Sequence, residues 1–207
     1  SGLASSAVGF RNKAASENAS AVGYGNNANA LAASAVGYNN TAGGVGSSTI
    51  GYNNTATNEN ASAFGYGNTA GGLASSAFGF SNTASGDNAN AFGYNNIASG
   101  SKSNVFGTGN TVSGSSSTAV GTANEVAAEN STAIGNNNTI SSGAENSAAL
   151  GNNISISLKD SVALGNNSTA TAINSVTGNS SYTKWAGVSD VVGVVSVGSS
   201  GATRQIQ

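Results

Sequence analysis

The sequence predicts an all-β parallel solenoid of about twelve coils, each about fourteen residues long. Three observations predict it: glycine recurs at a fixed interval, the residue before each of these glycines is apolar, and an asparagine follows most of them at a fixed distance. A helical repeat needs about 33 residues or more per unit, so the period excludes an α-solenoid. The glycines are Gly9, Gly23, Gly37, Gly51, Gly65, Gly79, Gly93, Gly107, Gly121, Gly135, Gly151 and Gly165.

The first element of each coil is a strand around the repeated glycine. The residue before the glycine is Val, Ile, Leu or Phe, and the residue before that is Ala in ten coils, with Thr49 and Val105 as the exceptions. Because side chains alternate along a strand, we expect Ala and Gly to share the tightly packed face and the apolar residues to share the other. The apolar column consists of Val8, Val22, Val36, Ile50, Phe64, Phe78, Phe92, Phe106, Val120, Ile134, Leu150 and Leu164.

The second element is a turn, and the third is a short strand. We expect asparagine to form the turn, because it tolerates a left-handed backbone and hydrogen-bonds its neighbours. This Asn column consists of Asn12, Asn26, Asn40, Asn54, Asn68, Asn82, Asn96, Asn110, Asn124 and Asn138. A small apolar residue follows two positions later, usually Ala, and a loop closes the coil. With small residues on both strands the roll is very narrow, and twelve coils about 4.8 Å apart give a rod about 55 to 60 Å long.

The apolar column is expected to point out of this narrow roll. Seven aromatic residues, called the aromatic column, follow the glycines of the first seven coils: Phe10, Tyr24, Tyr38, Tyr52, Tyr66, Phe80 and Tyr94. A lone chain would therefore expose an apolar stripe along its whole length, which soluble monomers rarely do. We expect copies of the chain to associate along the rod axis, with closed cyclic symmetry. The periodicity does not choose between two copies and three.

Composition excludes several classes of function. The chain has no His, Cys, Met or Pro, and only 7% of its residues are charged, with a net charge of −2. It has no disulfides and no imidazole or thiolate ligands, and near-neutral charge argues against nucleic acid as a partner. Disorder is the simplest alternative for such a polar chain, but 38% hydrophobic residues at fixed intervals argue against it. No segment is apolar enough to insert into a membrane, and the chain opens on a repeat at Ser1, which indicates a fragment of a longer protein.

We expect no catalysis, no metal site and no cofactor. A nucleophilic serine needs a general base, and with no His in the sequence the only candidates for that base are the lysines Lys13, Lys102, Lys159 and Lys184. Calcium-binding solenoid repeats need Asp in every coil, whereas only Asp87, Asp160 and Asp190 exist.

Segments such as SAVGFRNKA, SAVGYNNTA, STIGYNNTA, STAIGNNNTI and SVALGNNSTA resemble the head repeat of YadA-like trimeric autotransporter adhesins. The final VVSVGSSGATRQIQ is similar to the start of the neck in the same family. The resemblance implies a left-handed parallel β-roll that forms a homotrimer about a common axis. It also implies a surface adhesin of a Gram-negative bacterium, carried by a stalk and an outer-membrane anchor.

On this basis we expect three regions: a head at 1–178, an irregular cap at 179–193 that contains Trp185, and the start of the neck at 194–207. The bulky residues Phe64 to Phe106 in the apolar column and the two-residue insertion near Ser142 to Asn146 depart from the family pattern. The resemblance further implies that the apolar column lies at the trimer interface. The expected partners are extracellular matrix, such as collagen or fibronectin, or a host cell-surface receptor of the CEACAM type.

The candidate receptor-binding residues lie in the loop eight positions after each glycine. Leu3, Leu31, Val45 and Leu73 are apolar there, with acidic residues between them, and we call these four residues the loop ridge. Apolar anchors in a polar rim are typical of binding surfaces. The alternative is that they seal the gap between neighbouring chains.

Two other functions remain open. A purely structural spacer needs only the regular rod. An ice-binding solenoid needs a flat threonine array, and Thr41, Thr55, Thr69 and Thr83 form part of one. Lys13, Asn27, Ile97 and Glu125 interrupt that column.

Overall fold

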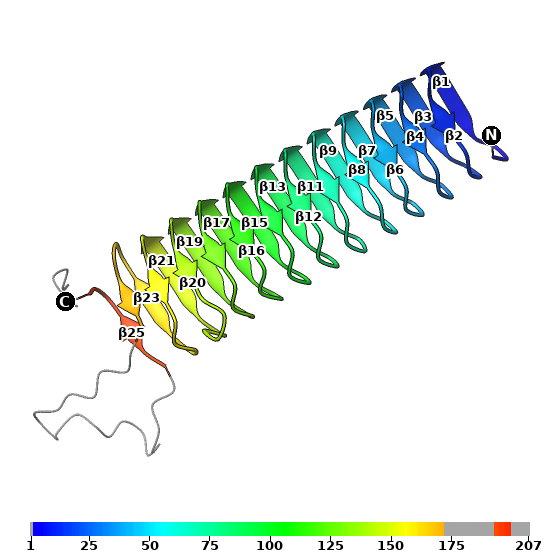
Figure 1. Cartoon of the computed structure of the whole chain (residues 1–207). Coiled ribbons are helices and arrows are strands. Elements are labelled where there is room, and N and C mark those ends of the chain that lie inside the picture. The colour runs from blue at the N-terminus through cyan, green and yellow to red at the C-terminus, as the bar shows by residue number, and fades with distance from the viewer. Residues whose placement is uncertain (1, 172–192, 200–207) are drawn as a thin grey trace, which may run out of the picture.

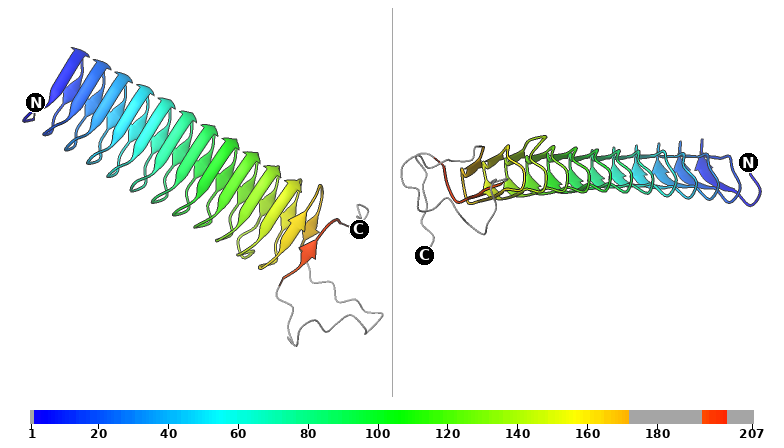
Figure 2. Two further views of the ribbon diagram at one scale, coloured as in Figure 1. Left: turned by 180° about the vertical axis from the view of Figure 1, so that it is seen from behind. Right: turned by 90° about the horizontal axis from the view of Figure 1, so that it is seen from below.

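The computed structural model describes residues 2–171 and 193–199, which form a long parallel β-solenoid without a helix among these residues (Figure 1). Each coil contributes one long strand and one short strand, and the two sets make two sheets. Seen from below, the rod is narrow and straight (Figure 2). The predicted all-β solenoid of about twelve coils is therefore confirmed.

The larger sheet has thirteen strands that are neighbours in sequence order: one from each of the twelve coils, and β25 from the segment near the C-terminal end. Its strands are β1 Ser6–Phe10, β3 Ser20–Tyr24, β5 Ser34–Tyr38, β7 Ser48–Tyr52, β9 Ser62–Tyr66, β11 Ser76–Phe80, β13 Asn90–Tyr94, β15 Asn104–Thr108, β17 Thr118–Thr122, β19 Thr132–Asn136, β21 Ala148–Asn152, β23 Val162–Leu164 and β25 Val195–Ser196. The pairing is parallel and in register, so that Val8 pairs with Val22 and Gly9 pairs with Gly23.

The smaller sheet has twelve strands of two residues each. They are β2 Lys13–Ala14, β4 Asn27–Ala28, β6 Thr41–Ala42, β8 Thr55–Ala56, β10 Thr69–Ala70, β12 Thr83–Ala84, β14 Ile97–Ala98, β16 Thr111–Val112, β18 Glu125–Val126, β20 Thr139–Ile140, β22 Ser155–Ile156 and β24 Thr169–Ala170. Equivalent positions of successive coils stack on one another, so each position of the repeat becomes a column along the rod.

The core consists of small side chains. From the second coil on, the residue two positions before each glycine is buried, as predicted, and so is the second residue of every short strand, for example Ala21 and Ala28 at 0% exposure. In the first coil Ala7 is exposed. A further buried column, which was not predicted from the sequence, is occupied by alanine or serine, such as Ala33 and Ser47. Side chains grow larger in the later coils, where Val105, Val112, Val126, Ile140 and Ile156 fill the same columns.

The Asn column corrects part of the prediction. Asn26 to Asn138 do lie between the two strands, but they are buried and their φ angles are not positive. The left-handed residue is the one before, for example Asn39 with φ 58° and Asn53 with φ 56°. The buried position is selected because the asparagine side chain continues the hydrogen bonding between coils where the strands are interrupted. In the eleventh coil Ile154 takes this position and Asn153, with φ 54°, takes the left-handed one.

Glycine is required at the repeated position because of its backbone conformation and its contact with the next coil, more than because the two strands of one coil lie close together. Gly37 has φ 119°, and a Cβ atom there would lie 2.1 Å from the carbonyl oxygen of Gly51. That Cβ atom would also lie 3.1 Å from Nδ2 of Asn40. The repeated glycines are all exposed or half-buried, so the prediction that glycine shares the buried face of the strand with Ala is wrong for glycine. An L side chain at this position would meet both a disfavoured φ and the next coil.

The two-residue insertion is absorbed in a loop. Gly143 adopts φ 91°, and the register resumes where Thr132 pairs with Ala148. At the C-terminal end, Val162 of β23 pairs with Val195 of β25, and the backbone N–H of Val194 donates to Oγ of Ser161 at 3.0 Å. The expected cap, including Trp185, lies outside the described residues except for Gly193.

Candidate interaction surfaces

The apolar column lies on the outer surface of the larger sheet, as predicted. Val8, Ile50 and Ile134 are 59%, 46% and 43% exposed in the single chain. The described residues of this column are all exposed or half-buried, because the inward positions of the strand are already filled by alanine. A continuous apolar stripe therefore follows the rod from the first coil to the twelfth.

Phenylalanine makes this stripe aromatic in its middle part. The rings of Phe64 and Phe78 stack with centroids 4.8 Å apart, and the stack continues to Phe92 and Phe106 at 4.9 and 5.4 Å. The rings stack because in-register parallel strands place identical residues directly over one another. Their larger side chains widen the stripe at the coils where the sequence departs from Val and Ile.

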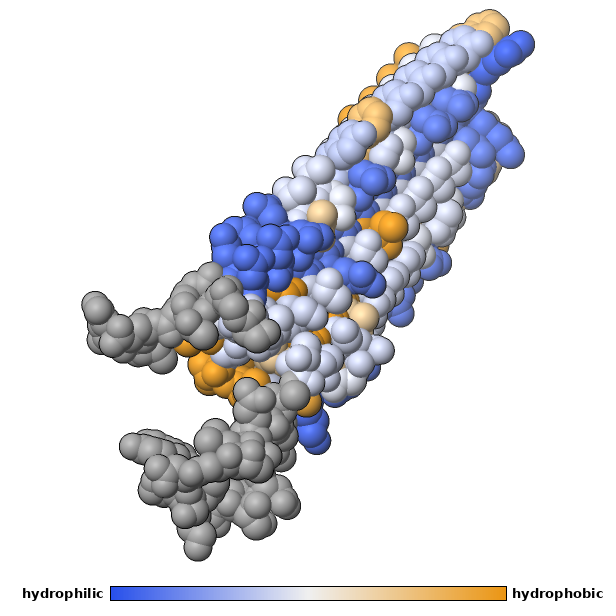
Figure 3. All heavy atoms as spheres, turned by 60° about the vertical axis from the view of Figure 1, so that its left-hand side comes forward, coloured by the Kyte–Doolittle hydropathy of each residue, from blue (hydrophilic) through white to orange (hydrophobic). Residues whose placement is uncertain are grey.

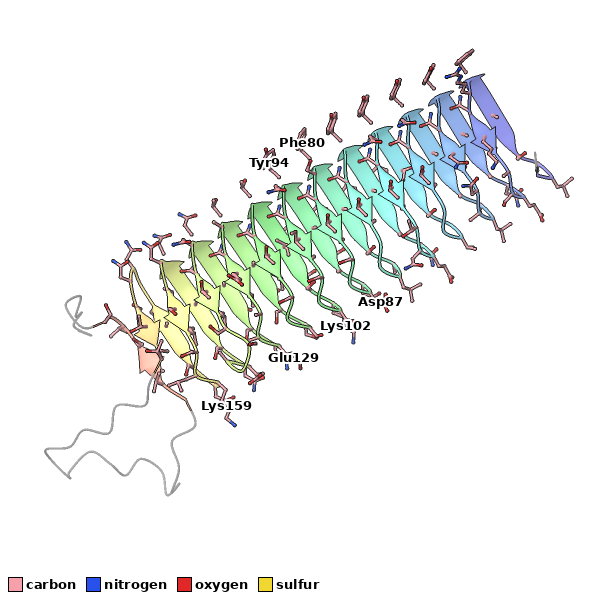
Figure 4. The ribbon with its side chains drawn as sticks, viewed as in Figure 1. Phe80, Asp87, Tyr94, Lys102, Glu129 and Lys159 are labelled. Atoms are coloured by element: carbon pink, nitrogen blue, oxygen red, sulfur yellow. The ribbon has the colours of Figure 1, made fainter. Side chains whose placement is uncertain are left out.

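The aromatic column forms a second, longer stack on the other side of the repeated glycine. Tyr38 and Tyr52 lie 4.9 Å apart with an angle of 3° between their planes, and all spacings from Phe10 to Tyr94 fall between 4.7 and 5.3 Å. These rings project from one edge of the rod, where Figure 4 labels Phe80 and Tyr94. In the later coils the same position is polar, and Asn152 donates from Nδ2 to Oδ1 of Asn166 at 2.7 Å.

The loop ridge lies in the closing loops of the coils. Leu3 is 78% exposed, and Leu31, Val45 and Leu73 are 43 to 46% exposed. Asp87, which occupies the equivalent loop position one coil after Leu73, accepts a hydrogen bond from the backbone N–H of Leu73 at 2.9 Å. In Figure 4, Asp87 projects from the edge opposite to Phe80 and Tyr94. The loop ridge and the aromatic column therefore occupy opposite edges of the rod.

Most charged side chains share the edge of the loop ridge. Asp87, Lys102, Glu129 and Lys159 lie along it in Figure 4, and Glu17 and Glu59 occupy equivalent loop positions. In the described part of the chain, no three acidic residues come close enough to hold a metal ion, in a sequence without His or Cys. The larger sheet, by contrast, presents an uncharged outer face.

On the face of the rod that Figure 3 shows, side chains form rows along the rod. In the threonine row of the smaller sheet, Thr69 is exposed and Thr41, Thr55 and Thr83 are half-buried. The exposed side chains of Ile97 and Glu125 interrupt the row. A single interrupted row of this kind does not make the flat lattice that ice binding needs.

Comparison with known families identifies the repeat. Residues 1–26, 14–40, 42–68, 70–96, 113–138 and 159–176 match the YadA head domain repeat, which together is more than half of the chain. The chain belongs to the YadA head family. No curated protein matches it significantly in sequence. YadA heads are associated with trimerisation and adhesion, and membership in the family implies a surface-exposed passenger segment of an autotransporter.

This YadA head contains no helix, among its described residues, that is long and apolar enough to cross a membrane. The two surfaces that were predicted from the sequence are both present, and they are separate. The apolar column runs along the outer face of the larger sheet, whereas the loop ridge follows an edge of the rod.

Proposed function

We propose that the chain is the head of a homotrimeric adhesin on the surface of a Gram-negative bacterium, with no catalytic activity. Three copies of a left-handed roll pack around a common axis, each through the apolar column. The outer-membrane anchor is a separate segment of the protein from the roll. The uninterrupted exposed apolar column carries this proposal, together with family membership.

The energetics support assembly through this face. Full burial of a Val, Leu, Ile or Phe side chain is worth about 1.5 to 3 kcal/mol. In the single chain, eight of the twelve residues of the column are 37 to 59% exposed and the other four are half-buried. Twelve such residues per copy supply on the order of 10 kcal/mol. That amount is comparable with the cost of losing free translation and rotation, about 4 to 15 kcal/mol.

Sedimentation velocity of the purified chain tests the assembly. The expected result is a single elongated species with the mass of three copies. A folded, monodisperse single chain would contradict the proposal, because its apolar column would then remain in contact with water. A stable species of two copies would reject the three-fold symmetry but not the association of chains through the apolar column.

The proposed ligands are extracellular matrix proteins such as collagen or fibronectin, or a host receptor of the CEACAM type, bound at the loop ridge. Three identical ridges on one rod, and many rods on one cell, convert weak contacts into firm attachment. Surface plasmon resonance of the trimer against both classes tests this step. Binding to neither class would leave the structural spacer as the remaining function, which the regularity of the rod also favours.

The absence of His and Cys from the whole sequence supports a non-catalytic role, since the usual base and thiol nucleophile are missing.

A further inference from the structure

A tripeptide pattern recurs at the exposed turns of the roll. Among the described residues, nine asparagines begin an Asn-x-Ser or Asn-x-Thr sequence: Asn18, Asn39, Asn53, Asn60, Asn130, Asn137, Asn153, Asn166 and Asn167. All except Asn166 have a φ between 52° and 58°, and all eight of these are exposed. Asn-x-Ser/Thr is the acceptor sequence for N-linked sugars. The acceptor sequences therefore coincide with the left-handed turns.

The middle residue of each of these eight tripeptides is buried. Ala19, Asn54 and Ser131 are 0 to 1% exposed, and the five others are equally buried. Because the middle side chain enters the core, the asparagine before it and the hydroxyl residue after it both lie on the outside of the coil. Ser62 and Thr132, for example, are only partly buried. The amide and the hydroxyl of each tripeptide are thus presented together to solvent.

The buried Asn column never begins such a tripeptide. Two positions after each of its asparagines stands Ala, Val or Ile, as at Asn54 and Ala56. A sugar on Asn54 would break its hydrogen bonds to Asn40 and Gly65 inside the roll. Acceptor sequences consequently occur only at asparagines where a bulky group leaves the core intact.

We propose that the eight exposed, left-handed asparagines are acceptors for N-linked sugars. In the transfer, Nδ2 of the asparagine forms a bond to C1 of a hexose, and the bond from C1 to the diphosphate of a nucleotide-activated donor breaks. The nucleoside diphosphate leaves, and a base of the transferase takes one proton from Nδ2. The product amide keeps one N–H, so a bond such as Asn137 Nδ2 to Asn153 Oδ1, now 2.9 Å long, can survive. The proposal does not rest on the adhesin role.

The eight sites fall into two groups. Asn18, Asn60 and Asn130 follow the loop position of the ridge, and they lie three and five coils apart, about 14 and 24 Å. Sugars at these sites do not touch one another. Asn39, Asn53, Asn137, Asn153 and Asn167 lie in the turns after the larger sheet, partly on successive coils only about 4.8 Å apart. In this second group a sugar hinders transfer to its neighbour, so we expect partial occupancy there and full occupancy at the first three sites.

A purely structural origin of the pattern is the competing explanation. Left-handed turns favour asparagine, and strands favour threonine, so folding alone could place them two positions apart. The two explanations differ in what a transferase does to the folded roll.

The experiment incubates the folded, purified protein with UDP-glucose and a soluble transferase that recognises Asn-x-Ser/Thr, and maps the products by peptide mass spectrometry. We expect one hexose at each of Asn18, Asn60 and Asn130, with an unchanged circular dichroism spectrum and thermal midpoint. Ser62→Ala should remove the hexose from Asn60 alone. Absence of transfer to the loop-edge sites, or loss of the fold on transfer, would overturn the proposal.

A gain-of-site variant provides the matched control. Asn95 is exposed and left-handed, with φ 54°, but it is followed by the buried Asn96 and by Ile97, which has no hydroxyl. Ile97→Thr completes an acceptor sequence in the column that already holds Thr83 and Thr111, and it should add a hexose at Asn95.

Ala56→Ser completes an acceptor sequence at the buried Asn54 instead. If circular dichroism shows that this variant is folded, Asn54 should stay unmodified. Transfer to Asn54 as efficient as at Asn95 would show that the turn geometry does not select the sites, and would refute the proposal.

Discussion

The side-chain amide of Asn54 donates a hydrogen bond to Oδ1 of Asn40, and the two atoms are 3.0 Å apart. The same nitrogen also lies 2.7 Å from the carbonyl oxygen of Gly65 in the following coil and 3.1 Å from that of Ile50. The pattern repeats along the buried Asn column up to Asn138. Each asparagine thus ties its own coil to the coils on both sides, in a buried interior of low dielectric constant where such bonds are strong.

Asn54→Ala should destabilise the roll by about 3 to 5 kcal/mol. The substitution leaves the carbonyl oxygens of Gly65 and Ile50 without this donor, and it removes an acceptor from the amide of Asn68. An unsatisfied buried polar group costs about 1 to 3 kcal/mol. Denaturant unfolding at matched protein concentration measures the loss.

The neighbouring Asn53 is the control for this prediction. It is exposed and left-handed, and glycine occupies the same position at Gly25, Gly67 and Gly109. Asn53→Gly should therefore change the free energy of unfolding by less than about 0.5 kcal/mol. Equal effects of Asn53→Gly and Asn54→Ala would show that the hydrogen bonds of the Asn column contribute no more to the stability of the roll than the turn residue does.

Two glycines of the roll separate backbone strain from close contact. In Gly79→Ala the new methyl group would lie 2.2 Å from the carbonyl oxygen of Gly93, at φ 116°, so the coils must move apart. Gly109→Ala has φ 62° and no atom within 4 Å, and Ala123 already occupies the equivalent position with φ 54°. We expect Gly109→Ala to cost about 1 to 2 kcal/mol and Gly79→Ala to cost considerably more. Thermal midpoints that fall by the same amount would contradict this expectation.

The sequence predicted what repeats, and it missed what depends on the path of the backbone within one coil. The fixed spacing of Gly9 to Gly165 is enough to predict the solenoid, and alternation along the strand is enough to turn the apolar column outward. The left-handed position was assigned to Asn40 rather than Asn39, because both are asparagine in that coil. Coils in which Gly25, Gly67 or Gly109 takes the earlier position carry the signal, since glycine there indicates a left-handed turn.

The surfaces were predictable to different degrees. That Leu31 and Leu73 are exposed follows from their place in a loop. Their location on the edge opposite to the aromatic column depends on how the loop closes each coil, and period alone does not contain that information.

The loop ridge can be tested separately from assembly. The double variant Leu31→Ser and Leu73→Ser should abolish binding to the host ligand while the mass measured by sedimentation stays unchanged. Serine is compatible with this loop, because Ser101 and Ser115 occupy the equivalent position. Retained binding would remove the ridge from the binding surface, and dissociation of the assembly would assign the ridge to the contact between chains instead. Thr139→Ser, on the smaller sheet, serves as the control for both measurements.

The apolar column should tolerate no charge. Phe78 and Phe92 stack with their centroids 4.9 Å apart on the outer face of the larger sheet. The double variant Phe78→Glu and Phe92→Glu removes about 1.5 to 3 kcal/mol of burial per side chain and would place unpaired carboxylates in the interface, at a further cost of several kcal/mol. We expect single chains in sedimentation velocity, with a circular dichroism spectrum that still shows the β-roll, because neither ring contributes to the alanine core.

Thr83→Glu is the control. It places the same charge on the smaller sheet, in a column where Glu125 occurs naturally, and should leave the assembly intact. Dissociation by Thr83→Glu but not by the double variant would place the contact between chains on the opposite sheet.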